Sequence, residues 1–581
     1  MNPSVVGIVG LGSVGEPLLR ALRAAGHDVV GVESDPDVLA RADRRMKSAA
    51  SADGPGGGDW VLTTDLSEVA RADVVIEAVP EDLVTKTDVL RRAGSLCAPH
   101  TVLVSTTAAL SLVRLASASG RPDRTLALRF LRPPSAGGAV ELVATPMSCA
   151  EGVGVLEALT ASLGLTPATI GARAGDDAVG LVYRFLNRAV AMIEEGYADR
   201  DAIDAAMRLG CGLPLGPLQL LDELGLDHVH AALTDRWERT GDGTFRPAPL
   251  LGSLAGAGAL GRKSGQGFYA YDETGTAEGA VRAPSLAGAL HDGGGAGTAD
   301  VLRVGVAGSG TMARGIAEVT AAAGLPTVLV ARSREKADAA VEAIGASLTR
   351  SVRRGRVTPG RKAAALGLIE GADSLSSLGD CDLVIEATAE ELPVKQAVFA
   401  QLGEVCRPGA LLATTTSSLS VAACADASGR PQDVLGLHFF NPAPAMRLVE
   451  LSRTAATGEG SVAAARAFCD RLGKTTVECG DRAGFIVNHL LFPYLGDAVR
   501  LLDRHDTSIK ETDTALKQGY GYPMGPFTLL DSIGLDVSLA IMRRLRAEFS
   551  APDFAVPPML EELVAGGSFG RKSGQGFRRW S

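Results

Sequence analysis

The stretch RVGVAGSGTMARGIAEVTAAAG, residues 303–324, decides the fold of the segment that contains it. A short apolar run leads into a glycine-rich turn, and an amphipathic run follows, which is the strand–turn–helix pattern of a dinucleotide-binding unit. In such a unit the turn amides and the N-terminus of the helix hold a pyrophosphate. We therefore predict a dinucleotide site on Gly308 and Gly310, with Ala313 at the third glycine position; a tight turn without a ligand is the alternative.

The same pattern opens the chain, where VVGIVGLGSVGEPLLRALRAAG (5–26) carries all three glycines. The chain also repeats elsewhere, because GRKSGQGF at 261–268 returns unchanged 309 positions later, at 570–577. This shift holds without a gap from about residue 65, whereas the opening patterns differ by 298 positions, so the first copy lacks 11 residues between about 37 and 64. A repeat of this length indicates a tandem duplication.

Each copy follows one plan. Strand-like runs such as VVIEAV and LVIEAT alternate with helix-like stretches, which predicts a parallel, doubly wound sheet. After about Gly171 and Gly480 the strand signals end and long apolar-periodic stretches follow, so the second part of each copy is expected to be helical. The fold class is α/β plus all-α, in two tandem copies. The expected units are a degenerate Rossmann-type domain (1–171), a helical domain (172–272), a Gly- and Ala-rich linker (273–301), a dinucleotide-binding Rossmann domain (302–479) and a second helical domain (480–581).

Composition excludes several classes of protein. The 581 residues carry a formal net charge of −10, so no global basic field favours a nucleic acid or an anionic membrane as partner. The chain enters a strand pattern at once and has no apolar window of membrane-spanning length, which predicts a leaderless cytoplasmic protein. The 8 cysteines show no C-x-x-C spacing, so we expect isolated thiols and no metal site.

The residue that ends the second strand reports on the cofactor ribose. The first copy has Glu33 there, which accepts hydrogen bonds from a free 2′-hydroxyl. The second copy has Ala331, followed by Arg332, Ser333 and Arg334. Because a guanidinium group binds a 2′-phosphate that a carboxylate would repel, we expect the second copy to prefer NADP(H), with NAD(H) possible. In the alternative interpretation, the two arginines only begin a solvated helix.

The strongest signal lies in LLATTTSSLS (411–420) and LGLHFFNPAPAMRLVELS (435–452). Together with AGSGTMARGIAE, DLVIEATAEELPVK, RAGFIVNHLL, GYPMGPFTLLD and GRKSGQGF in this order, they resemble the 3-hydroxyacyl-CoA dehydrogenase family over essentially the whole second copy, and more weakly over the first. The resemblance implies an NAD(P)-binding domain followed by the helical C-terminal domain of that family. It also implies reversible oxidation of a (3S)-3-hydroxyacyl-CoA, such as 3-hydroxybutyryl-CoA, to the 3-oxoacyl-CoA in the cleft between them.

The resemblance assigns catalytic roles within the second copy. Removal of a hydride from a secondary alcohol requires a base for the hydroxyl proton, and a neutral imidazole suits that exchange. His438 is the candidate base, and Glu450 orients its ring and stabilises its protonated form. By the same resemblance Ser417 and Asn488 bind the reacting oxygen and the thioester, and Asn441 shapes the histidine loop and the substrate site.

The resemblance also marks binding residues. Those expected to bind the cofactor are Gly308, Gly310, Thr311, Met312, Arg332, Ser333, Arg334, Glu390 and Lys395. The basic arm LTRSVRRGRVTPGRK (348–362) corresponds to the family's contact with the CoA nucleotide, whose phosphates would meet Arg350, Arg353, Arg354, Arg356 and Lys362. A solvated helix face is the alternative for this arm.

The first copy has lost the chemistry. Ala108, Arg129, Arg132 and Val179 stand where the second copy has Ser417, His438, Asn441 and Asn488, and Glu141 alone is kept. Because an arginine is not a proton acceptor near neutral pH, we expect this copy to be catalytically dead. In place of the basic arm it has SAASADGPGGGD (48–59), interpreted as a Gly-rich acidic loop. A new anion site on Arg129 and Arg132, which would make this half a sensor, is the alternative.

The duplication itself has a structural interpretation. Family members pair through their helical domains, so fusion of two copies is expected to make an internal pseudo-dimer in one chain. The leading function is an NADP-preferring 3-hydroxyacyl-CoA dehydrogenase for short chains. The alternatives are a dehydrogenase that acts on a carrier-protein thioester or a small 3-hydroxy acid, and a nucleotide-responsive binding protein without turnover.

Overall fold

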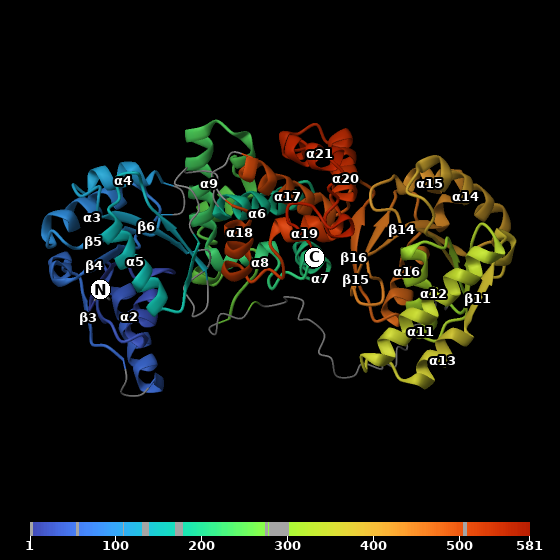
Figure 1. Ribbon diagram of the computed structural model, residues 1–581, viewed down its shortest axis with the longest axis horizontal. Coiled ribbons are helices and arrows are strands. Elements are labelled where there is room, and N and C mark those ends of the chain that lie inside the picture. Colours follow the sequence, from blue (N-terminus) through green and yellow to red (C-terminus); the bar gives the residue numbers. More distant parts are fainter. Residues whose placement is uncertain are drawn as a thin grey trace.

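The computed structural model of this protein describes residues 4–53, 57–107, 110–130, 139–168, 178–272, 277, 301–503 and 508–580. Two α/β domains lie at opposite ends of the molecule, and the helices of both copies fill the space between them (Figure 1). The two copies found in the sequence are therefore also two equivalent halves of the structure.

The first α/β domain is built on an eight-stranded sheet of order β3-β2-β1-β4-β5-β6-β7-β8. Its strands are β1 (Val5–Val9), β2 (Asp28–Val32), β3 (Trp60–Thr63), β4 (Val74–Glu77), β5 (Val102–Ser105), β6 (Thr125–Phe130), β7 (Ala139–Val143) and β8 (Thr166–Ala168). Its helices are α1 (Gly15–Ala24), α2 (Pro36–Asp53), α3 (Leu83–Leu96), α4 (Leu112–Ala118) and α5 (Ala150–Ser162).

The second α/β domain repeats this sheet in the order β11-β10-β9-β12-β13-β14-β15-β16. Its strands are β9 (Val304–Ala307), β10 (Thr327–Val330), β11 (Ile369–Ala372), β12 (Leu383–Glu386), β13 (Leu411–Thr414), β14 (Val434–Phe439), β15 (Leu448–Arg453) and β16 (Thr475–Gly480). Its helices are α11 (Thr311–Ala322), α12 (Arg334–Arg353), α13 (Pro359–Gly367), α14 (Leu392–Val405), α15 (Val421–Ala427) and α16 (Glu459–Arg471). Alternate strand residues enter two cores, with Leu383 and Ile385 in one and Val384 in the other.

The sheet is parallel as predicted, except at one place in each copy. β6 and β7 pair antiparallel, as do β14 and β15, whereas every other pair in the two sheets is parallel. The short connection from Phe439 to Leu448 explains the reversal, because it leaves no room for a crossover helix. This reversal places His438 directly opposite Glu450.

The helical parts confirm the all-α prediction. The first consists of α6 (Ala178–Glu194), α7 (Arg200–Cys211), α8 (Pro217–Leu224), α9 (Leu226–Thr240) and α10 (Pro249–Gly256). The second consists of α17 (Val487–Asp503), α18 (Ile509–Thr514), α19 (Pro526–Ile533), α20 (Leu535–Glu548) and α21 (Pro558–Ala565). α6 packs against α17, and one apolar core includes residues of both. Among the described residues, no helix has the length and apolar character needed to cross a membrane.

The 11-residue difference between the copies is structural. In the second copy, α12 and α13 form a packed helical arm before β11, whereas in the first copy α2 is the only helix found between β2 and β3 in the part of that segment that the structure describes. The first-copy segment 48–59 is not wholly a loop, because α2 continues to Asp53. The helical arm is therefore a structural feature of the second α/β domain.

The repeated octapeptide is part of the scaffold in both copies. Gly261 and Gly570 have φ angles of 91° and 84°, which a side chain rarely tolerates. The neighbouring lysines, Lys263 and Lys572, form ion pairs with Asp227 and Asp536. The octapeptide therefore closes the end of each helical domain.

Candidate functional site

The centre of the site is a histidine–carboxylate pair on the two antiparallel strands of the second copy. His438 Nδ1 lies 2.7 Å from Glu450 Oε2. His438 is 7% exposed and Glu450 is fully buried. Because Nδ1 faces a carboxylate, the ring carries its proton there and leaves Nε2 as the acceptor.

The glutamate is held from its other side by the start of α17. Its Oε1 accepts hydrogen bonds from the backbone N–H groups of Ile486 (3.0 Å) and Val487 (2.8 Å). These two donors fix the position of the carboxylate independently of the histidine. Asn488 is the next residue of α17 and is 8% exposed, and its contact with the substrate stays a prediction.

Two phenylalanines enclose the imidazole. The ring centroid of His438 lies 4.5 Å from that of Phe440 and 5.6 Å from that of Phe485. Phe485 has a φ of 45°, a left-handed conformation that costs energy at an aromatic residue. Both rings lie in the motifs that carry the family resemblance, Phe440 in HFFNP and Phe485 in RAGFIVNHLL, but neither motif shows that its ring would pack on the imidazole.

Ser417 lies in the loop after β13, at the carboxyl edge where β14 also ends. Its N–H donates to Glu390 Oε1 (2.9 Å), and its hydroxyl lies 3.3 Å from the same oxygen. Lys395 is 1% exposed, and its ammonium binds both oxygens of Glu386 at 2.9–3.0 Å and lies 3.4 Å from Glu390. Lys395 therefore positions Glu390 from beneath, and its direct contact with a cofactor remains a prediction.

The glycine-rich turn of the second copy fits a pyrophosphate. Gly308 has a φ of +136°, and a Cβ there would lie 2.3 Å from the Ala387 carbonyl oxygen. A Cβ at Gly310 would meet nothing within 4 Å, and among the described residues no side chain caps this end of α11. The first amides of α11, beginning at Thr311 and Met312, therefore face open space, where an anion is favoured.

The residues expected to contact the 2′ substituent of the cofactor ribose lie just after β10. Arg332 is exposed, and within the described part of the chain it has no hydrogen bond or ion pair. Ser333 caps α12 by accepting a hydrogen bond from the Lys336 amide. Arg334 instead donates to the Gly371 carbonyl (3.0 Å) and pairs with Asp338 (3.0 Å). Arg332 is therefore the better placed of the two arginines.

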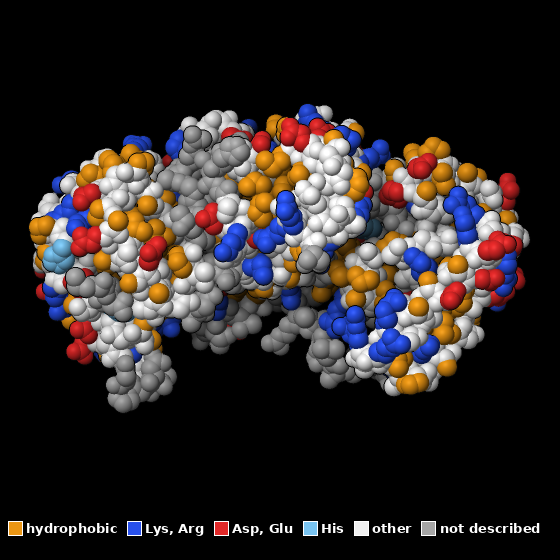
Figure 2. Space-filling model, viewed as in Figure 1, with side chains coloured by type: hydrophobic (Ala, Val, Ile, Leu, Met, Phe, Trp, Pro, Cys, Tyr) orange, Lys and Arg blue, Asp and Glu red, His pale blue; other side chains and the backbone are white. Residues whose placement is uncertain are grey.

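The basic arm presents its cations to solvent. Arg350, Arg353, Arg354 and Arg356 are all exposed at the end of α12 and beyond it, while Lys362 bonds the Thr349 hydroxyl (2.8 Å). Figure 2 shows Lys and Arg side chains gathered on the second α/β domain near α12 and α13. Exposed guanidinium groups on one helical hairpin are suited to phosphate binding. Asn441 is likewise exposed, in the loop after β14.

The first copy keeps the geometry and changes the chemistry. Arg129 stands opposite Glu141 in the antiparallel register, with 3.7 Å between Arg129 Nη1 and Glu141 Oε2. Arg129 is 2% exposed and Glu141 is fully buried, and Glu141 Oε1 accepts from the Ala178 amide (3.1 Å) as Glu450 does from the start of α17. A permanently protonated guanidinium has therefore taken the place of the base.

The structure describes only some of the other first-copy positions that correspond to site residues of the second copy. Ala108 and Arg132 lie outside the described residues, and Val179 is a buried residue of α6. Glu33 is turned into the glycine-rich turn of its own copy, where its Oε2 accepts from the Leu11 amide (2.8 Å). The carboxylate thus occupies one of the turn amides in this structure.

The first copy also reaches the site of the second. A Cβ at Gly210, near the end of α7, would lie 2.9 Å from Leu448, 3.0 Å from Val487 and 3.6 Å from Phe440. Next to Gly210 an apolar cavity of about 30 Å³ lies between the copies. The residues that line it are Phe185, Met207, Cys211, Leu213, Leu491, Tyr494, Tyr522, Pro523, Met524, Pro526 and Leu529. No sequence signal predicted this contact, because it joins residues hundreds of positions apart.

Family models match nearly the whole chain, each of them twice. The model described as "3-hydroxyacyl-CoA dehydrogenase, NAD binding domain" matches residues 5–173 and 303–482. The model described as "3-hydroxyacyl-CoA dehydrogenase, C-terminal domain" matches residues 179–271 and 484–580.

Individual relatives agree with these matches. The chain is 43% identical over 279 residues to 3-hydroxybutyryl-CoA dehydrogenase of Mycobacterium tuberculosis (strain ATCC 25618 / H37Rv), covering 48% of this chain and 98% of the relative. It is 42% identical over 282 residues to 3-hydroxyadipyl-CoA dehydrogenase of Escherichia coli (strain K12), covering 48% of this chain and 59% of the relative. The solved structure of 3-hydroxybutyryl-CoA dehydrogenase from Escherichia coli K12 covers 98% of this chain and 100% of its own, with a TM-score of 0.62 and 21% identity, and shows the shared fold.

Proposed function

Because this chain belongs to the 3-hydroxyacyl-CoA dehydrogenase family, whose members are NAD-dependent oxidoreductases, we propose that one site, in the second copy, carries the whole activity. The reaction is the interconversion of a (3S)-3-hydroxyacyl-CoA and its 3-oxoacyl-CoA. The single observation that carries the assignment is the contrast between two equivalent pairs, His438 with Glu450 and Arg129 with Glu141. The relatives named above do not favour a carrier-protein substrate, a free hydroxy acid or a protein without turnover.

The pair is arranged for proton exchange with the substrate hydroxyl. His438 Nε2 accepts the proton while Nδ1 remains hydrogen-bonded to Glu450, whose negative charge stabilises the imidazolium. The bound nicotinamide supplies the hydride acceptor. Ser417 and Asn488 bind the oxygen and the thioester, and the two phenylalanine rings exclude water from the imidazole. An assay of acetoacetyl-CoA reduction with NADH and with NADPH tests the activity directly.

We propose that the second copy prefers NADP(H). The support is Arg332, an exposed guanidinium without a partner in the described residues, which directly follows Ala331, the residue that stands where the first copy has Glu33. The family description names NAD, so cofactor use as such does not depend on this proposal.

Arg332→Ala is expected to raise the KM for NADPH by about 10-fold or more, because a charge-assisted contact contributes about 1.5–3 kcal/mol. The KM for NADH should hardly change. Arg334→Ala is the matched control, since its guanidinium is already engaged with Gly371 and Asp338, and should have the smaller effect. A wild-type protein that already prefers NADH in steady-state kinetics would contradict the proposal.

We propose a short or medium acyl chain as substrate, with the CoA phosphates on the basic arm. The carbons of the chain beyond the four of an acetoacetyl group extend toward the apolar cavity beside Gly210. A cavity of this size accepts about one methylene group, at a gain of about 0.8 kcal/mol. One wall of this pocket is then supplied by the catalytically dead copy.

Leu213→Phe, which fills the cavity from the first copy, is expected to lower kcat/KM for 3-oxooctanoyl-CoA by about 10-fold or more. The kcat/KM for acetoacetyl-CoA should stay unchanged, because we expect its four carbons not to reach the cavity. Leu215→Phe is the matched control, since it is similarly half-buried on the same segment but does not line the cavity. Equal losses for the two substrates would show that the cavity does not hold the chain.

We propose that the two helical parts form an internal pseudo-dimer. The equivalent helices α6 and α17 pack together, and α7 of the first copy packs against β15 and β16 of the second. Tyr197 donates to the Gly480 carbonyl (2.8 Å), and Arg482 both lies over the Tyr197 ring and pairs with Glu195 (2.7 Å). The first copy is thus a structural partner that also borders the working site.

A further inference from the structure

Arg188 on α6 and Asp497 on α17 occupy the same position in the two copies, 309 residues apart. They also meet, with Arg188 Nη2 2.6 Å from Asp497 Oδ2, and their side chains are 9% and 0% exposed. A second equivalent pair meets beside them, because the rings of Phe185 and Tyr494, also 309 residues apart, have centroids 5.7 Å apart. Contacts between equivalent residues place both pairs near the local two-fold axis of the pseudo-dimer.

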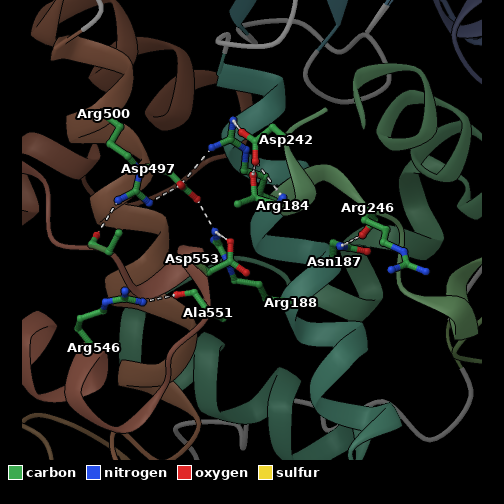
Figure 3. Close-up of polar contacts among 12 residues, drawn as sticks. Arg184, Asn187, Arg188, Asp242, Arg246, Asp497, Arg500, Arg546, Ala551 and Asp553 are labelled. Atoms are coloured by element: carbon green, nitrogen blue, oxygen red, sulfur yellow. Dashed lines mark hydrogen bonds and ion pairs between the residues drawn. The ribbon is translucent and has the colours of Figure 1, made fainter. Parts of the chain in front are cut away.

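The charges around the axis are distributed unequally between the copies (Figure 3). Asp497 is bound by Arg184 (3.1 Å) and Arg188 of the first copy and by Arg500 (2.7 Å) of its own, and Arg188 also pairs with Asp553 (3.0 Å). Burial alone would raise the pKa of Asp497, but the three arginines, Arg188 first, hold it well below its usual range. The carboxylate is therefore ionised and neutralised chiefly by the other copy.

Pairing of either helical part with a second copy of itself through this face would be unfavourable. If two second copies paired through α17, Asp497 would face Asp497 and would lose both Arg184 and Arg188. If two first copies paired through α6, Arg188 would face Arg188 with no Asp497 between them. A buried charge left without its partner, or placed against a like charge, strongly destabilises an interface.

We propose that divergence at this position, to arginine in one copy and aspartate in the other, makes the pairing heterotypic: each helical part accepts the other copy and rejects a second copy of itself. This inference rests on the pseudo-dimer proposed above and goes further, because it names the residues that select the partner. It also explains the retention of a copy without a catalytic base. Once the second copy carries Asp497, the partner that supplies Arg184 and Arg188 is the first.

A charge-swap cycle in the full chain tests the selection. Arg188→Asp and Asp497→Arg should each lower the urea midpoint, because each sets like charges against one another. The double variant Arg188→Asp/Asp497→Arg should regain part of the loss, because it restores the pair between these two positions, although Arg184 and Arg500 then face an arginine. Arg543→Asp serves as the control, since its pair with Glu561 lies exposed within the second copy and should matter little. If the double variant loses as much stability as the two single variants lose together, the inference is overturned.

The state of the two halves supplies a second measurement. A protease site inserted within residues 278–300 allows the folded chain to be cut, and native mass spectrometry then reports which halves stay together. Cut wild type and the cut double variant should remain one first half with one second half, whereas each cut single variant should dissociate about 100-fold more readily. Self-paired second halves would refute heterotypic selection. Wild-type halves that separate at once would instead refute the pseudo-dimer itself, and an acetoacetyl-CoA assay on the uncut chain reports the enzymatic proposal separately.

Discussion

His438→Ala is expected to lower kcat for acetoacetyl-CoA reduction by at least about 100-fold, the usual contribution of a positioned acid–base group. The fold should survive, because Glu450 keeps its two backbone donors at the start of α17. Steady-state kinetics, with a urea titration to confirm folding, measures the effect. Near-normal turnover in this variant would remove His438 from the mechanism.

Two further variants separate the base from its surroundings. Glu450→Gln keeps the shape of the carboxyl group but removes the charge that stabilises the imidazolium, so kcat should again fall steeply. Arg129→Lys is the matched control at the equivalent position of the first copy, since it keeps a cation beside Glu141. Turnover should be unchanged in this control, and a marked loss would show that the first copy takes part in the chemistry.

Deletion of residues 1–272 is expected to abolish most folded, active protein. α17 would lose the apolar face that packs on α6, at about 2.5 kcal/mol for each 100 Å² re-exposed. Asp497 would also lose Arg184 and Arg188, and breaking a buried pair costs about 3–5 kcal/mol. Such losses are comparable with the whole stability of a domain, about 5–15 kcal/mol.

Circular dichroism, size-exclusion chromatography and activity per milligram measure the outcome of the deletion. The chain cut within residues 278–300 is the control, because it has lost the covalent connection but still has the first copy. We expect the cut chain to remain active and the truncated chain to aggregate or unfold. A truncated chain that stays monomeric, stable and active would show that the first copy is dispensable.

The sequence alone determined the duplication, the family and the order of the domains. These features are carried by local signals: glycines at fixed spacing, apolar strand-like runs that alternate with helix-like stretches, and the HFFNP and MRLVE motifs around His438 and Glu450. The loss of the catalytic base in the first copy could also be predicted from the sequence. Arg129 stands where the second copy has a histidine, and an arginine does not accept a proton near neutral pH in any surroundings. Such properties need no knowledge of which segments meet.

Only the tertiary structure decided how distant segments combine. The antiparallel reversal of β15, which sets Glu450 against His438, follows from strand pairing, and the left-handed Phe485 is held by packing around it. The approach of Gly210 to the site and the meeting of Arg188 with Asp497 join residues of different copies, and periodicity along one segment contains no information about them. Contacts of this kind depend on packing geometry and on charges brought together out of water, so they exist only once the chain has folded.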